Sequence, residues 1–492
     1  MAQILVNPRR VIGRRDPKIY GHFLEHFHRQ VYGGVYEPGS SLSDTHGLRT
    51  DVRDALRRIR VPVMRWPGGC FVSAYHWKDG VGSPRRPVFN KAWRVEESNA
   101  FGTDEFIQLC REVACEPYLC TNAGTGTPEE MSDWVEYCNL ASQGTWARAR
   151  TANGHPRPYA VRYWSIGNEN YFDFELGAKK PAEWGRFVRE SAKMMRRVDP
   201  TIELLAASIN DLDWNTALLR EAGDLLNWVS IHGYWDPLWE RNTPAGYEDS
   251  VAQSLAVARA IETAEHLLGA TGYLGKLRIA FDEWNLRGWH HPNVVSGTSE
   301  EQYLAPRDLN DRNQDYTMAD AVFSACFLNE CHRHCATVGM ANFAPVVNAR
   351  GCIFTHAGGL VLRPTYHVFD LYANRMAATV VDSWLESGER FEAAPGGKAA
   401  AVPSLDAVAT LDTEAGRLCV SVVNRHPDRA VDVSVVAAGY RPVTQHVLCG
   451  PGKDSSNTVE RPREVVLEER RPGRSAVEIE AHSVNVLVLE RE

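Results

Sequence analysis

Residues Tyr163–Asn170 read Tyr-Trp-Ser-Ile-Gly-Asn-Glu-Asn, so an apolar run leads directly into Glu169. A second run, Ile279–Asn285, reads Ile-Ala-Phe-Asp-Glu-Trp-Asn and leads in the same way into Glu283. A short apolar run of this kind favours a buried strand. When parallel strands close into a barrel, catalytic side chains lie at the carboxyl ends of the strands. We therefore expect Glu169 and Glu283 to face one barrel mouth.

Eight β-rich runs with helical segments between them predict an α/β fold built on a parallel sheet. The eight runs are Ile19–His26, Val61–Trp66, Glu116–Asn122, Val161–Asn168, Ile202–Ser208, Trp228–Tyr234, Leu277–Trp284 and Thr337–Phe343. Helices are expected at Asp51–Arg60, Thr103–Ala114, Pro128–Leu140, Pro181–Val198, Val251–Leu268 and Tyr316–His334. Thr103 is a candidate hydroxyl cap because acidic residues follow it. The pattern fits a (β/α)8 TIM barrel better than a doubly wound sheet.

The pattern changes after about residue 377 to short alternating strands separated by turns rich in proline and glycine. The expected strands include Leu418–Asn424, Val431–Val436, Glu464–Glu468, Val477–Ile479 and Val484–Leu489. They predict an antiparallel β-sandwich. The expected domains are therefore a catalytic barrel at residues 17–376 and a sandwich at residues 377–492. Residues 1–16 contain a strand-like stretch, Gln3–Val6, that is a candidate to pair with the sandwich.

Two carboxylates at one barrel mouth suit the hydrolysis of a glycosidic bond. One carboxyl protonates the departing oxygen, and the other attacks the anomeric carbon. A mechanism that retains the anomeric configuration needs the two groups about 5 to 5.5 Å apart. The alternative for either glutamate alone is that it caps the following helix or pairs with a nearby arginine.

Composition excludes several classes of protein. The 492 residues are 44% hydrophobic and 24% charged, and no apolar run approaches the roughly 18 residues that cross a bilayer, so no membrane partner is expected. A net charge of -8 gives no broad basic face for nucleic acid. The arginine-rich start lacks an apolar signal segment, which favours a cytoplasmic location. Eleven cysteines, an odd number in a long chain, are expected to be reduced thiols.

Further motifs point to one family. The segments Gly167–Glu169 and Asp282–Asn285 resemble the catalytic motifs of retaining barrel glycosidases. The segments Gly21–His26, Tyr32–Ser40, Arg65–Gly69, Tyr75–Gly82 and Phe101–Phe106 resemble the α-L-arabinofuranosidases of glycoside hydrolase family 51. The resemblance runs in order from about residue 17 to about residue 375. It implies a (β/α)8 barrel with a C-terminal β-sandwich, no metal or other cofactor, and a homo-oligomer, often a hexamer.

The resemblance also implies an activity and roles for individual residues. The activity is retaining, exo-acting release of terminal α-L-arabinofuranosyl residues from arabinose-containing oligosaccharides. Glu169 matches the acid/base and Glu283 the nucleophile. The positions matching sugar-binding residues are Glu25, Arg65, Cys70, Trp93, Asn168 and Tyr234. A hydrogen bond from Tyr234 to the nucleophile is one expectation, and packing under the rim is the other. We expect His232 to be structural.

Two positions depart from the family pattern. Pro345 stands where the family commonly has glutamine, and proline offers no side-chain donor or acceptor. Arg287 stands where an aromatic residue often lies, and it is expected either to receive an acidic substituent of the substrate or to pair with a nearby acid such as Asp282. Because of these departures, the alternative remains that the chain is a retaining glycosidase acting on another sugar, such as a galactofuranoside or a β-glycan.

Two other functions remain as alternatives. A carbohydrate-binding protein without activity would keep the same fold, although the presence of both carboxylates argues against it. Clusters of cysteine and histidine, at Cys110–Cys120 and Cys331–Cys335, lack the CxxC spacing of zinc sites. We therefore interpret these clusters as packing or surface residues.

Overall fold

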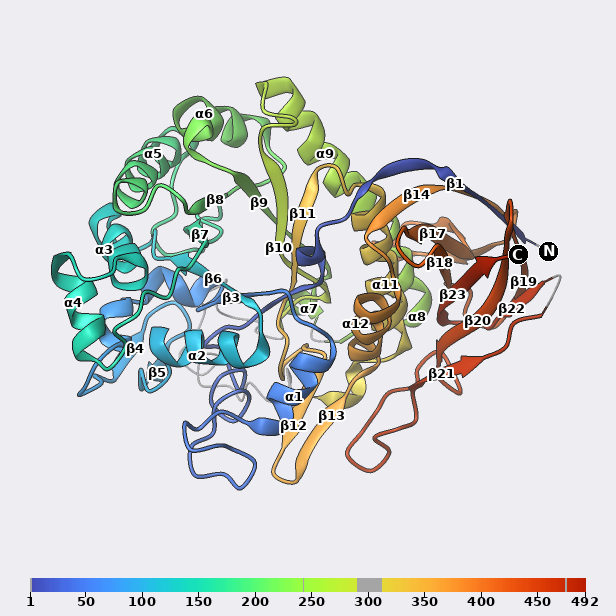
Figure 1. Cartoon of the computed structure of the whole chain (residues 1–492), viewed down its shortest axis with the longest axis horizontal. Helices are drawn as coiled ribbons and strands as arrows, with labels where there is room; N and C mark the ends of the chain where they lie inside the picture. Colours follow the sequence, from blue (N-terminus) through green and yellow to red (C-terminus); the bar gives the residue numbers. More distant parts are fainter. Residues whose placement is uncertain (1, 242, 290–311, 474–475) are drawn as a thin grey trace.

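The computed structural model describes residues 2–241, 243–289, 312–473 and 476–492. Eight parallel strands close into a barrel in the order β10-β11-β2-β3-β6-β7-β8-β9, as the sequence predicts (Figure 1). They are β2 (Gly21–Phe23), β3 (Val63–Trp66), β6 (Glu116–Thr121), β7 (Tyr163–Ile166), β8 (Glu203–Ala207), β9 (Trp228–Asp236), β10 (Arg278–Arg287) and β11 (Val338–Phe343). Each predicted run contains or overlaps one barrel strand. The two glutamates therefore belong to the fourth and seventh strands.

Helices cover the outside of the barrel (Figure 1). They are α1 (Thr50–Arg58), α2 (Thr103–Val113), α3 (Pro128–Asn139), α4 (Gly144–Ala152), α5 (Pro181–Val198), α6 (Leu212–Ala222), α7 (Leu238–Arg241), α8 (Tyr247–Ala252), α9 (Leu255–Thr271), α11 (Met318–Arg333) and α12 (Pro364–Arg375). Two expectations were wrong. Gly102, not Thr103, caps α2, because Thr103 is helical and its hydroxyl accepts a hydrogen bond from Trp134. The helix expected at Val251–Leu268 is divided into α8 and α9 at Ser254.

The C-terminal part is a nine-stranded sheet in the order β21-β20-β23-β18-β17-β14-β1-β19-β22. Its strands are β1 (Ala2–Arg14), β14 (Thr379–Glu386), β17 (Leu405–Asp412), β18 (Arg417–Asn424), β19 (Val431–Ala437), β20 (Tyr440–Cys449), β21 (Val466–Arg470), β22 (Val477–Ile479) and β23 (Ser483–Arg491). Strand β1 pairs antiparallel with β14 but parallel with β19, so the sandwich is not purely antiparallel. Three small hairpins complete the strands: β4–β5 (Val88–Asn90, Val95–Glu97), β12–β13 (Ile353–His356, Gly359–Leu362) and β15–β16 (Arg390–Ala393, Ala400–Pro403).

Helices α11 and α12 lie between the barrel and the C-terminal sheet (Figure 1). Asn329 and Arg333 of α11 both bond the carboxylate of Asp406 in β17. The Tyr372 hydroxyl of α12 lies 2.7 Å from the Ser421 hydroxyl of β18. These buried polar contacts join the two parts of the chain. The division of the domains at residue 377 remains a proposal, supported by the position of β14 directly after α12.

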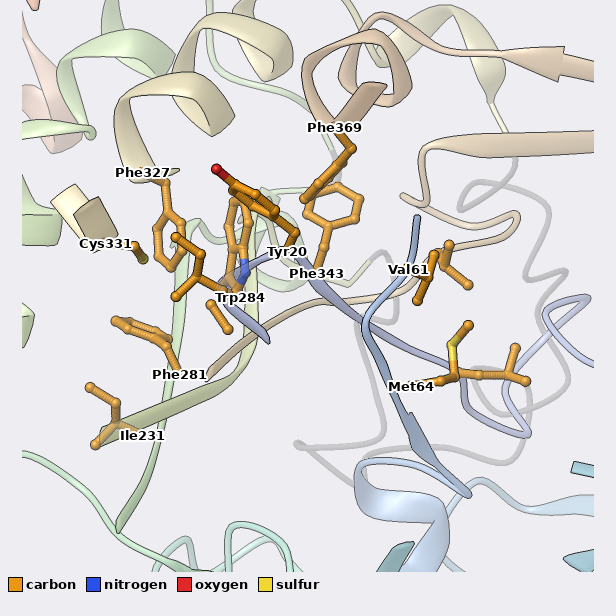
Figure 2. Packing of buried hydrophobic residues seen from close by; sticks show 14 of the residues in the cluster. Tyr20, Val61, Met64, Ile231, Phe281, Trp284, Phe327, Cys331, Phe343 and Phe369 are labelled. Carbon is orange, nitrogen blue, oxygen red and sulfur yellow. The ribbon is translucent and has the colours of Figure 1, made fainter. Parts of the chain in front are cut away.

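Aromatic rings fill the space between β10, β11 and the helices α11 and α12. Trp284 stacks on Phe327 with ring centroids 3.6 Å apart, and Phe343 and Phe369 meet the same tryptophan (Figure 2). All four side chains are buried. Trp284 directly follows Glu283, so this packing also fixes the strand that carries the glutamate.

The substitution Phe327→Ala should lower the free energy of unfolding by about 3 to 5 kcal/mol, because it removes the ring that stacks on Trp284 and leaves a cavity. Urea unfolding followed by tryptophan fluorescence measures the loss. The control is Phe89→Ala, at a phenylalanine with 62% of its surface exposed, which should change the unfolding midpoint little. Equal midpoints for the two variants would contradict this assignment of the core.

Candidate active site

Glu283 lies at the centre of a cluster of charged side chains at the carboxyl ends of the barrel strands. Its Oε1 is 2.5 Å from Nη1 of Arg65 in β3. Its Oε2 accepts a hydrogen bond of 2.8 Å from the Tyr234 hydroxyl in β9, which is one of the two contacts expected for that tyrosine. The side chain of Glu283 is only 4% exposed. Both oxygens are therefore held, and the carboxylate has a fixed orientation.

Strand β10 is irregular at Glu283. Ala280 pairs with Ser230 and Glu283 pairs with His232, so β10 has one residue more than β9 over this stretch. Such a β-bulge re-aims side chains. Neighbouring side chains of a regular strand point to opposite faces. The bulge lets both Asp282 and Glu283 reach the buried interior of the barrel.

Asp282 anchors the arginine that binds Glu283. Arg65 Nε lies 3.4 Å from Asp282 Oδ2, and Arg65 Nη2 donates to Asn168 Oδ1 at 2.8 Å. The hydroxyls of Tyr118 and Ser230 donate to Asp282 at 2.6 and 2.5 Å. Burial acts to raise the pKa of Asp282, but the positive charge of Arg65 and bonds to its neighbours outweigh it and lower the pKa to about 2. Asp282 is thus a buried anion at neutral pH.

The surroundings of Glu283 favour its ionised form. Burial acts to raise its pKa, but the charges of His232 and Arg65 and the bonds from Arg65 and Tyr234 outweigh burial, and the pKa is lowered. A carboxylate that attacks an anomeric carbon must be ionised. The electrostatics therefore suit Glu283 to the role of nucleophile.

Glu169 follows β7 in a tight turn and has a left-handed backbone with φ +46°. That conformation is uncommon for residues other than glycine and is found at functional sites. Gly167, at φ +73°, permits the turn, because a Cβ there would lie 2.2 Å from Asn170 Oδ1. One oxygen of Glu169, one of Glu283 and a ring nitrogen of His232 all lie within 4.8 Å of one another. The two glutamates thus meet across one mouth, as expected.

His232, for which a structural role was expected, has its ring among three carboxylates. Nδ1 lies 2.8 Å from Glu169 Oε1 and 3.7 Å from Glu283 Oε2, and Nε2 lies 3.4 Å from Asp282 Oδ1. Burial acts to lower the pKa of His232, but the negative charge of Glu283 and the other two acids raise it to about 10. The imidazolium therefore donates to Glu169 and compensates the buried anions.

Glu25 follows β2 and lies beside the same cluster. Its Oε1 accepts hydrogen bonds from the Phe71 backbone at 3.1 Å and from Trp93 Nε1 at 2.9 Å. Gly69 makes room for it, because a Cβ at that position would lie 2.8 Å from Oε1. Burial, followed by the charge of Glu283, raises the pKa of Glu25 to about 8. At neutral pH Glu25 is largely a protonated acid.

A cavity of about 580 Å³ opens beside Glu169 and Tyr234. Its lining includes Cys70 and Trp93, so the structure brings these two predicted residues to the same site. The wall is mostly aromatic: it contains Tyr171, Phe172, Phe174, Trp235, Trp239 and Trp289. Phe172 and Phe174 stack on each other and are 37% and 38% exposed. Flat apolar faces beside polar groups suit the face of a sugar ring.

Arg287 is buried away from this cavity. It forms ion pairs with Asp236 at 2.7 Å and with Asp320 at 2.9 Å. One of the two expectations was that Arg287 pairs with a nearby acid, and it does so, although the acid is not Asp282. Pro345 lies buried in the loop after β11. The anchoring role of Asp282 and the contacts of His232 with three carboxylates are features of the site that sequence reasoning did not identify. The only signal for Asp282 was its place in the motif next to Glu283.

Two groups of side chains in the described part of the chain have the spacing of metal ligands: Cys70 with Glu169 and Glu175, and Glu169 with His232 and Glu283. A histidine binds a metal only in its neutral form. The raised pKa of His232 opposes that form. Cysteine likewise binds as the thiolate, and burial, reinforced by the charge of Glu175, raises the pKa of Cys70. Without a metal ion, the raised pKa values thus favour the protonated forms of His232 and Cys70. All eleven cysteines are free, as expected.

The substitution Glu25→Gln should flatten the dependence of stability on pH. Because the folded-state pKa of Glu25 is raised to about 8, the native state binds more protons than the unfolded state between the ordinary pKa and 8, and stability falls as pH rises through this window. Glutamine stays neutral, so the variant should not show this decrease in the free energy of unfolding, which amounts to at most about 1.4 kcal/mol per pH unit. Urea unfolding at pH 5, 6.5 and 8 measures this difference. Parallel pH profiles for the two proteins would contradict the raised pKa.

Comparisons with known proteins identify the family of the chain. The family model of the α-L-arabinofuranosidase 1 domain matches residues 55–252, and that of the α-L-arabinofuranosidase C-terminal domain matches residues 282–483. An intracellular exo-α-(1→5)-L-arabinofuranosidase of Halalkalibacterium halodurans is 31% identical over 444 residues, which cover 88% of this chain and 86% of the relative.

Solved structures are similar over the whole chain. A crystal structure of the α-L-arabinofuranosidase of Thermotoga maritima with arabinose is 35% identical, has a TM-score of 0.88 and covers 99% of both chains. The family 51 α-L-arabinofuranosidase of Thermotoga petrophila RKU-1 is also 35% identical, with a TM-score of 0.88 and full coverage of both chains. The chain therefore belongs to the α-L-arabinofuranosidases of glycoside hydrolase family 51.

Proposed function

We propose that this protein is a retaining, exo-acting α-L-arabinofuranosidase that releases terminal arabinofuranosyl residues from arabinose-containing oligosaccharides. The observation that carries the proposal is the pair Glu169 and Glu283, with carboxylate oxygens within 4.8 Å of each other. Retaining glycosidases place their carboxyls about 5 to 5.5 Å apart, whereas inverting enzymes need about 6.5 to 9.5 Å to admit a water molecule. The observed spacing supports retention.

In the first step, ionised Glu283 attacks the anomeric carbon while Glu169 donates a proton to the departing oxygen. His232 donates to Oε1 of Glu169, so Oε2, which has no other bond among the described residues, is the oxygen suited to carry that proton. In the second step Glu169 takes a proton from water, which attacks the glycosyl ester and releases Glu283. Arg65 and Tyr234 hold Glu283 through both steps.

Sugar binding is assigned to Glu25, Asn168, Trp93 and Cys70 around the nucleophile. Glu25 Oε2 and Asn168 Nδ2 are buried and make no hydrogen bond within the described residues. Buried polar atoms are normally satisfied, so both atoms are suited to bind hydroxyls of the substrate. The aromatic wall at Phe172 and Phe174 lies on the side of Glu169, where the departing sugar must sit.

Location and assembly are further parts of the proposal. An intracellular location is supported by the eleven free cysteines and by the name of the Halalkalibacterium halodurans relative, an intracellular exo-α-(1→5)-L-arabinofuranosidase. No helix in the described residues has the length and apolar character needed to span a membrane. A homo-oligomer, with the hexamer as the first candidate, is proposed from the family resemblance alone.

The stereochemistry and substrate are tested together. Hydrolysis of 4-nitrophenyl α-L-arabinofuranoside should release the α-anomer first, because two displacements at one carbon restore its configuration. Proton NMR within the first minutes, before mutarotation, identifies the anomer. The matching β-D-galactofuranoside and β-D-xylopyranoside should be poorer substrates. First release of the β-anomer would overturn retention, and preferred turnover of another sugar would overturn the assigned substrate.

The roles of the two glutamates are separated by substrates with different leaving groups. Glu283→Ala should abolish turnover of every substrate, by about 10⁴-fold or more. Glu169→Ala should lose much less activity on an activated aryl arabinofuranoside than on an arabino-oligosaccharide, because a good leaving group needs little protonation. Steady-state kcat/KM on both substrates measures the contrast. Equal losses for both variants on both substrates would contradict the assigned roles.

A further inference from the structure

Arg350 is a buried arginine that packs against two aromatic rings, Tyr234 and Trp289. Its exposed fraction is 2%, and Nε, Nη1 and Nη2 make no hydrogen bond within the described residues. Arginines in protein interiors are normally paired, because an uncompensated buried charge is costly. Two other buried arginines of the barrel follow this rule: Arg65 binds Glu283, and Arg287 binds two aspartates. Within the described residues, the guanidinium nitrogens of Arg350 are therefore left without a hydrogen bond.

The position of Arg350 is fixed by the loop after β11. Asn285 of β10 donates to the carbonyl oxygens of both Ala344 and Arg350, at 2.9 and 3.1 Å. On either side of Arg350, Arg363 donates to the carbonyls of Ala349 and Gly351, each at 2.7 Å. The backbone that carries the guanidinium is thus held in place without a ligand.

The guanidinium lies against the candidate active site. Its central carbon is 4.8 Å from the ring centroid of Tyr234 and 3.1 Å from that of Trp289, and both rings line the cavity. Tyr234 binds Glu283 directly. The charge of Arg350 also acts on the pKa of Glu25, and the charge of Glu283 acts on the pKa of Arg350. Arg350 is therefore placed on the side of the nucleophile, where the glycon must bind.

Besides the Arg350 guanidinium, two other side-chain groups of the site are buried and make no hydrogen bond within the described residues, Glu25 Oε2 and Asn168 Nδ2. These three side chains come from the ends of β2 and β7 and from the loop after β11. Pro345, five residues before Arg350, supplies no side-chain donor or acceptor to the site. A guanidinium offers five N–H donors and no acceptor, so it recognises paired oxygen atoms.

We propose that Arg350 is a specificity-determining residue that donates hydrogen bonds to oxygen atoms of the glycon bound at Glu283. Its ligands are acceptor oxygens of a furanosyl ring, either hydroxyl oxygens or a carboxylate at the exocyclic carbon. This inference rests on the proposed function, because it places the glycon by the nucleophile.

The test compares Arg350→Ala, Arg350→Gln and Arg350→Lys with the native enzyme. The substrates are 4-nitrophenyl α-L-arabinofuranoside, its 2-, 3- and 5-deoxy analogues, and the analogue with a carboxylate at C5. Loss of a hydrogen bond to a charged donor should lower kcat/KM of Arg350→Ala on the parent by about 10- to 100-fold. On the deoxy analogue that lacks the contacted oxygen, Arg350→Ala should have nearly the same kcat/KM as the native enzyme, since this substrate has no oxygen there for Arg350 to bind. Arg350→Lys should recover part of the activity.

The pattern of losses identifies which oxygen is bound. If the effect of Arg350→Ala on kcat/KM disappears with only one deoxy analogue, Arg350 binds the hydroxyl that this analogue lacks. If the native enzyme prefers the substrate with the C5 carboxylate and Arg350→Ala abolishes that preference, Arg350 binds an acidic glycon. Arg363→Lys is the matched control, because Arg363 is a buried arginine that supports the same loop; its losses should be uniform across substrates. Thermal unfolding of each variant shows that it is folded.

Two results would overturn the proposal. One is a uniform loss across all substrates for the three Arg350 variants, as for Arg363→Lys, which would make Arg350 structural. The other is unchanged kcat/KM in Arg350→Ala. Failure of the proposed function looks different, because the native enzyme itself would then not hydrolyse any of the arabinofuranosides.

Discussion

The contact on which the site depends is the one between Arg65 and the two adjacent acids, Asp282 and Glu283. Two neighbouring carboxylates in the interior of a barrel would normally take up protons. The guanidinium of Arg65, fixed by Asp282 and Asn168, together with the imidazolium of His232, keeps both acids ionised. Without this balance of charges Glu283 would not be a nucleophile at neutral pH.

Backbone irregularities place these charges. The bulge in β10 turns Asp282 and Glu283 toward the same interior, and the left-handed backbone at Glu169 brings the second carboxyl over the mouth. Both irregularities sit on a rigid support, since Trp284 of β10 packs into the aromatic cluster with Phe327 (Figure 2). The packing of the barrel core therefore also holds the catalytic side chains at the barrel mouth in position.

Three of the buried arginines near the barrel mouth, Arg65, Arg287 and Arg350, differ in what satisfies them. Arg65 and Arg287 have carboxylates of the chain itself, so their contribution is structural and electrostatic. Arg350 has aromatic faces beside it but no hydrogen-bond acceptor among the described residues. This contrast is what separates a residue that builds the site from one that is suited to bind substrate.

The sequence by itself determined the eight strands, the sandwich strands and the two glutamates at strand ends, because each depends on local apolar patterns and on motifs that are contiguous in the chain. It could not place His232 among three carboxylates, pair Arg287 with Asp236 and Asp320, or reveal Arg350. These contacts join residues from strands and loops far apart in the sequence, and they depend on a bulge and on loop conformations that local patterns do not encode. The charge states and the burial of the side chains at the barrel mouth therefore depend on the tertiary structure, because only the closed barrel brings these residues together.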